Sequence, residues 1–151
     1  MAFSVFVGNM IGSKRTREAR EYVKLSVITG VVWGLISGTF MLIFKSELIS
    51  MLSTSREVNR IVSDSFTILT FYVFIEPLSK VITGVITGLG KQGTASVVTL
   101  IGYWVIGIPL TILYICLHHR EESIFGIWLG ASVSLVFILM LQYWIVHGTN
   151  Y

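Results

Sequence analysis

The chain has 151 residues, of which 54% are hydrophobic and only 13% are charged, and its formal net charge at pH 7 is +3. Soluble domains are roughly a quarter charged, so the composition excludes an ordinary water-soluble domain and favours a membrane protein. The basic residues gather between Lys14 and Lys24 with no second basic face, which argues against a nucleic-acid partner. A single cysteine, Cys116, excludes an internal disulfide and a CxxC metal or redox motif.

The first predicted element, residues 1–12, looks like the end of a preceding helix. Longer apolar stretches follow, each near the ~20 residues that an α-helix needs to cross ~30 Å of hydrocarbon. Barrel strands would need alternating apolar and polar residues, which these stretches lack. We therefore expect an all-α fold, a polytopic transmembrane helix bundle of about four spans. The predicted transmembrane helices are residues 24–44, 61–89, 94–117 and 124–146.

The connections between these helices are predicted at residues 45–60, 90–93 and 118–123, and short links favour antiparallel neighbours. Ser55 is a residue type favoured at helix N-caps, so the second transmembrane helix is expected to begin early. The loops on one side of the membrane carry six Lys and Arg residues, and the loops on the other side carry four. The positive-inside rule then places the N-terminal segment and the C-terminus in the cytoplasm of a multi-pass membrane protein.

Glycines recur at intervals of four on the first and second predicted transmembrane helices. Such spacing creates a groove into which another helix backbone can approach closely. The groove predicts helix packing, either as a static contact, which is the commoner use, or as the sliding surface of a moving bundle. The glycines are Gly30, Gly34 and Gly38 on the first helix, and Gly84 and Gly88 on the second.

Glu76 is the strongest candidate for a functional side chain. It lies 15 residues beyond Ile61, or about 22 Å along an α-helix, which places it near the middle of the bilayer. A charge there costs ~2.5–3.5 kcal/mol and usually marks an ion or substrate path. Pro77 follows it and cannot donate a backbone hydrogen bond to Val73, so a helix bend is expected. A bent helix with an acid at the bend resembles a transporter site.

Two further charged residues share this helix. Lys80 lies four residues after Glu76, so the two side chains can form an internal ion pair. The alternative to a functional acid is then a structural pair that neutralises itself. Asp64 lies near the outer end of the helix, where it is either an accessory acid that guides cations or simply a hydrated side chain.

Other motifs carry weaker signals. Gly88, Gly90 and Gly93 match G-x-G-x-x-G, but apolar helices flank them where a dinucleotide site needs a βαβ unit. The loop with His118, His119, Glu121 and Glu122 is read as a solvated turn in preference to a metal site. The sequence therefore predicts no metal and no catalytic residues, and the protein is not expected to be an enzyme.

Five motifs in order carry a resemblance to a known family. They resemble the multidrug and toxic compound extrusion (MATE) family of eukaryotes, over its second lobe from the end of helix eight to helix twelve. The likeness spans nearly the whole chain. The motifs are Val7-Gly8-Asn9-x-x-Gly12 with the basic loop after it, Phe74-x-Glu76, Thr87-Gly88-Leu89-Gly90-Lys91-Gln92, Gly102-Tyr103-Trp104-Val105-Ile106-Gly107-Ile108-Pro109-Leu110, and Gly126-Ile127-Trp128-Leu129-Gly130.

The resemblance implies an antiporter that exports organic cations, drugs or metabolites in exchange for protons or sodium by alternating access. It implies that Glu76 is the cation-binding or proton-coupling acid. The spacing of four residues, and not the resemblance, suggests Lys80 as its modulating partner. The family usually has Arg in place of Thr87 and a small or neutral residue in place of Lys80.

By the same resemblance, a coupling ion (H⁺ or Na⁺) is expected and no cofactor. The expected partners are the lipid bilayer, small organic substrates, and the first lobe and remaining second-lobe helices, which this sequence lacks. The alternative is a degenerate, non-transporting membrane fragment that only packs against partner helices.

Overall fold

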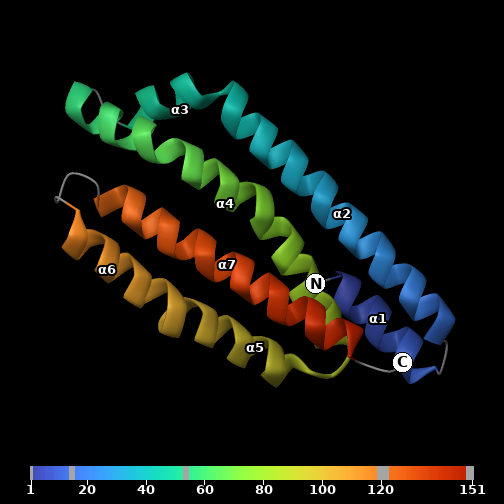
Figure 1. The fold of residues 1–151 in the computed structure, drawn as a ribbon. Helices are drawn as coiled ribbons and strands as arrows, with labels where there is room; N and C mark the ends of the chain where they lie inside the picture. Colours follow the sequence, from blue (N-terminus) through green and yellow to red (C-terminus); the bar gives the residue numbers. More distant parts are fainter. Residues whose placement is uncertain (1, 14–15, 53–54, 119–122, 149–151) are drawn as a thin grey trace.

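The protein is described here by a computed structural model that covers residues 2–13, 16–52, 55–118 and 123–148. Helices joined by short connections make up these residues (Figure 1). The segments α5, η1 and α6 follow one another directly and form one long helix. The elements are α1 (Ala2–Gly12), α2 (Thr16–Ile43), α3 (Lys45–Leu52), α4 (Arg56–Gly88), α5 (Gln92–Leu100), the π-helix η1 (Ile101–Gly107), α6 (Ile108–Leu117) and α7 (Ser123–His147).

Four helices are long and apolar enough to cross a membrane, which confirms the predicted all-α transmembrane bundle. Helix α4 lies between α2 and α7, and the α5–η1–α6 helix lies along the other side of α7 (Figure 1). The short helix α1 packs against both α2 and α4. The candidate spans are Arg17–Ile43, Val58–Gly88, Gln92–Leu117 and Ile124–His147.

The connection predicted at residues 45–60 contains a short helix that was not predicted, α3 (Lys45–Leu52). This helix packs against α4 and buries Ile49, which gives a short polar segment enough apolar contact to stay helical. Helix α4 begins early, at Arg56, with Ser55 at the N-cap position. The Ser55 side chain makes no capping hydrogen bond, although its backbone carbonyl accepts one from the Asn59 amide at 3.1 Å.

Glycines let α2 and α4 approach closely. A Cβ added at Gly34 would collide with the Phe74 carbonyl oxygen, and one at Gly30 would lie 3.0 Å from the Leu78 Cα atom. Gly38 faces the Phe74 side chain in the same way, at 3.4 Å. These contacts fix the face of α4 that carries Phe74 and Leu78 against α2.

The predicted glycine pair on α4, Gly84 and Gly88, does not contact α2 in this way. Gly88 is approached by α1, because a Cβ added at Gly8 would lie 3.3 Å from the Gly88 carbonyl oxygen. A Cβ added at Gly84 would meet no heavy atom within 4 Å, so Gly84 makes no close contact in the described part of the chain. Only Gly88 of this pair therefore lies in a helix–helix contact here.

Candidate functional site

Glu76 lies inside α4, which continues through Pro77 without a break. Pro77 has no N–H group, so the Val73 carbonyl lacks its usual intrahelical partner. The Ser37 hydroxyl of α2 lies 3.4 Å from this carbonyl oxygen and also donates to the Trp33 carbonyl at 2.8 Å. A neighbouring serine thus partly satisfies the backbone group that the proline frees, as transmembrane helices commonly require.

The carboxylate of Glu76 lies on the side of α4 that faces away from α2. At 3.6 residues per turn, Phe74 and Leu78, which touch the α2 glycines, are on the opposite side of the helix from Glu76. Tyr72 lies one turn before Glu76 on the same side of the helix. Glu76 therefore belongs to the side of α4 that α7 and η1 approach.

Tyr72 joins three elements at this point. Its ring lies 5.6 Å from the Trp128 ring of α7, measured between centroids. Its hydroxyl oxygen lies 3.2 Å from the Tyr103 hydroxyl oxygen of η1, and either group can be the donor. Tyr72, one turn before Glu76, thus links α4 to both α7 and η1.

The structure brings Glu76 and Lys80 together as a loose ion pair. The Lys80 Nζ atom is 3.8 Å from a Glu76 carboxylate oxygen, and the Lys80 side chain is 71% exposed while that of Glu76 is 37% exposed. A long, largely exposed ammonium group moves easily and holds its partner weakly. Lys80 therefore shields the Glu76 charge without enclosing it.

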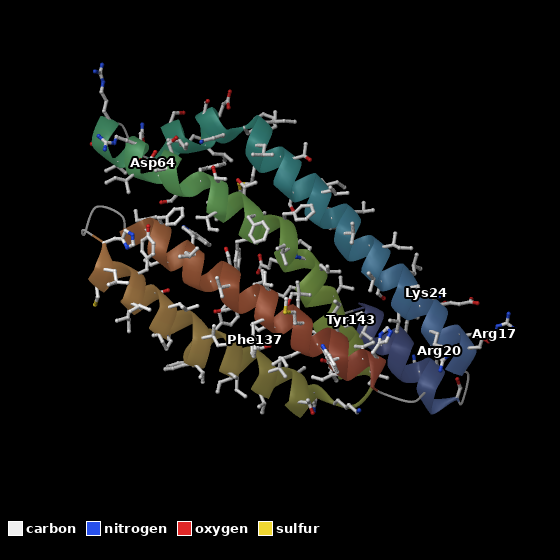
Figure 2. The ribbon with its side chains drawn as sticks, in the orientation of Figure 1. Arg17, Arg20, Lys24, Asp64, Phe137 and Tyr143 are labelled. Carbon is white, nitrogen blue, oxygen red and sulfur yellow. The ribbon has the colours of Figure 1, made fainter. Side chains whose placement is uncertain are left out.

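Asp64 is not brought to this site. It is exposed on α4, and 12 residues separate it from Glu76, or about 18 Å along the helix. Figure 2 shows Asp64 at one end of the bundle, whereas Arg17, Arg20 and Lys24 of α2 lie at the other end. Any effect of the Asp64 charge on Glu76 would therefore act over this distance.

The proposed metal loop lies mostly outside the described residues, because 119–122 are not described. Among the residues that the structure describes, no group of His, Cys, Asp and Glu could hold a metal ion. His118 stacks instead on the Tyr114 ring, with the two centroids 4.2 Å apart.

An open groove that Tyr103 also lines was not predicted from the sequence. Its volume is about 540 Å³, and it runs between the last turns of α4 and the α5–η1 helix. Its lining contains both hydroxyl or amide side chains and apolar ones. The lining residues are Thr83, Thr87, Gln92, Ala95, Ser96, Thr99, Leu100, Tyr103 and Trp104.

Gln142 of α7 is a buried polar residue that was not predicted from the sequence. It is fully buried, and its Nε2 atom donates to the Thr83 hydroxyl at 2.8 Å, which ties α7 to the groove side of α4. Its Oε1 atom has no hydrogen-bond partner among the described residues. The sequence signal that could have identified Gln142 is an amide side chain inside an apolar run. Such a side chain, like a charged one, costs free energy in lipid unless it is paired.

Long apolar helices, with an acid and several polar side chains at the contacts between them, define an integral multi-pass membrane protein. Interior ionisable groups in this class mark ion or substrate paths. A family model for MatE matches residues 1–113. The chain therefore belongs to the MatE family.

Curated relatives agree with this assignment. Protein DETOXIFICATION 30 of Arabidopsis thaliana is 31% identical over 150 residues, which are 99% of this chain and 30% of the relative. Protein DETOXIFICATION 29 of the same plant is 29% identical over the same shares of the two chains. A protein of Bacillus thuringiensis subsp. konkukian named "Probable multidrug resistance protein NorM" is 26% identical over 91% of this chain and 30% of its own length.

The chain spans 30% of the length of these curated relatives. No solved structure matches it.

Proposed function

We propose that this chain forms part of a secondary antiporter that exports organic cations, drugs or metabolites across a membrane in exchange for protons or sodium. The family supports the proposal, and so do relatives whose names refer to detoxification and multidrug resistance. In this proposal Glu76 is the coupling acid and Lys80 is its modulating partner.

The position of Glu76 carries the proposal. A carboxylate on the α7 and η1 side of α4 can be neutralised by a proton, by a metal cation or by an organic cation, and one negative charge favours one such partner at a time. Competition for a single charge is the simplest basis for exchange between an ion and an organic cation. The loose contact with Lys80 fits this role, because a weakly held ammonium group yields to an incoming cation.

The direct test replaces Glu76→Gln in the complete gene product that carries this sequence, expressed in cells that lack other exporters. Efflux of a fluorescent organic cation such as ethidium should fall to the background of untransformed cells, since an amide has no charge to exchange. Glu47→Gln makes the same chemical change at an exposed site on α3 and should leave efflux unchanged.

Wild-type efflux from Glu76→Gln cells would reject the coupling role of this residue. Absence of efflux from the wild-type protein, once it is shown to be inserted in the membrane, would favour the non-transporting alternative instead.

A further inference from the structure

The third span contains a π-helical segment, η1, which ends two residues before Pro109. Pro109 follows the segment and has no N–H group to donate. The Ile108 amide donates to the Tyr103 carbonyl, five residues back, in place of the four-residue step of an α-helix. Local π-type bonding is a known way for transmembrane helices to accommodate proline, and π-segments recur at functional sites.

The wider turn decides which side chains face which neighbour. A Cβ added at Gly102 would collide with the Ile138 side chain, and one at Gly107 would collide with the Ser134 hydroxyl, so both glycines face α7. Five residues of a regular α-helix turn about 140° beyond a full circle and would point the two glycines apart. The π-segment keeps both glycines against α7 and leaves Tyr103 to face α4.

Tyr103 consequently touches two parts of the site. Its hydroxyl lies 3.2 Å from that of Tyr72, which shares the Glu76 side of α4, and its side chain also lines the open groove. It is the one side chain among the described residues that belongs to both the groove lining and this tyrosine pair.

The groove itself offers hydrogen-bond acceptors. Thr87 donates its hydroxyl proton to the Thr83 carbonyl at 2.9 Å, and Thr99 donates to the Ala95 carbonyl at 2.9 Å, so their oxygen lone pairs are left for the groove. The lining carries no charged side chain. Its volume of about 540 Å³ lies within the ~300–1,000 Å³ typical of small-molecule sites. Such a groove suits an apolar molecule with N–H or O–H donors.

We propose that this groove binds the hydrogen-bond-donating part of the transported molecule, and that Tyr103 is the positioning residue that links groove occupancy to Glu76. The inference rests on the proposed exchange role of Glu76. When Tyr103 donates to the Tyr72 oxygen, the Tyr72 proton is free to point at the Glu76 carboxylate one turn away. A molecule in the groove that engages the Tyr103 hydroxyl removes this support, and Glu76 then holds its ion differently.

Few other titratable groups face Glu76. Lys80 and Tyr72 do so from α4 and Tyr103 from η1, while α5 and α6 contain no Asp, Glu, Lys, Arg or His. Helix α7 brings the uncharged Trp128 ring toward Tyr72, and its titratable side chains, Tyr143 and His147, lie in its last turns. Helix α2 packs on the opposite side of α4, and α1 contains no charged residue. Among these groups Glu76 is the only acid, and it lies one turn along α4 from Tyr72.

The test replaces Tyr103→Phe in the complete gene product and measures ethidium efflux over a series of pH values. The ring and its packing remain, and only the hydroxyl is lost. We expect the ethidium concentration for half-maximal efflux to rise roughly threefold to tenfold, the usual effect of one lost hydrogen bond, with a displaced pH profile and little change in maximal rate. Tyr22→Phe is the matched control, because its ring stacking on Phe6 survives the change.

A second variant protects the test against misfolding. Tyr72→Phe removes the same hydrogen bond from the other side, and the double variant should be no worse than either single one, since both delete one interaction. Additive effects, or a Tyr103→Phe protein with the wild-type pH profile and half-maximal concentration, would overturn the inference. If Glu76→Gln abolishes efflux while Tyr103→Phe changes nothing, only the present inference fails; if Glu76→Gln is active, the proposed function fails first.

Discussion

Lys80 sets the electrostatic surroundings of Glu76 more than any other side chain that the structure describes near it. Its ammonium group, 3.8 Å away, repels cations that approach the carboxylate, yet its high exposure weakens that repulsion. We predict that Lys80→Ala keeps efflux active and lowers the coupling-ion concentration for half-maximal efflux about twofold to fivefold, the range expected for a loose pair. Ion titrations of efflux in sealed vesicles measure this shift.

The control for this change is Lys24→Ala, which removes an exposed ammonium group from α2, the helix that packs on the side of α4 opposite Glu76. It should leave the ion titration unaltered. An unchanged titration in Lys80→Ala as well would show that the ion pair has no part in coupling.

At this scale the sequence predicted pairs along one helix better than pairs between helices. Glu76 and Lys80 meet because residues four apart on a helix share a face, whatever surrounds them. The Tyr72–Tyr103 and Thr83–Gln142 contacts depend on how separate helices are rotated and placed, which no local spacing encodes.

The close contact between α2 and α4 depends on glycines of α2, which have no side chain. Because the Phe74 backbone carbonyl fills the space beside Gly34, a larger side chain there must push two helices apart. We predict that Gly34→Leu lowers the stability of the protein by about 1–3 kcal/mol, the usual cost of overpacking, and reduces the folded yield. Thermal unfolding in detergent and the folded fraction after gel filtration measure these effects.

Gly84→Leu is the matched control, since it makes the same change on a neighbouring helix where an added Cβ meets nothing within 4 Å. It should unfold near the wild-type temperature. Equal stability of the two variants would remove the argument that the glycines of α2 set the helix contact.

The helices that the sequence predicted are those with a strong local pattern of apolar residues. Long apolar runs identify transmembrane helices, because only helices satisfy their own backbone groups in lipid. Helix α3 was missed because its polar sequence lies between two spans and its stability comes from packing Ile49 near α4. The π-segment was missed because Pro109 predicts a disturbance, but the kind of disturbance depends on the contacts with α7.

Basic residues are somewhat more numerous on one predicted side of the membrane than on the other, six against four. Arg17, Arg20 and Lys24 gather at the end where Tyr143 of α7 lies, and Asp64 lies at the opposite end (Figure 2). Basic residues beside the first span favour retention of that end in the cytoplasm, and aromatic side chains such as Tyr143 favour the membrane interface. An even number of spans brings the C-terminus back to the same side.

We therefore predict that a tag placed between α1 and α2, and a tag at the C-terminus, both face the cytoplasm, whereas a tag between α3 and α4 faces the other side. Proteolysis of sealed, right-side-out vesicles from cells expressing the complete gene product measures this: the first two tags should survive until the membrane is opened by detergent, and the third should be cleaved at once. Replacing the three basic residues of α2 with serine changes the count of Lys and Arg on the two sides from six against four to three against four, so a mixed orientation is expected. Opposite accessibility of the first two tags would contradict the even number of crossings on which this orientation depends.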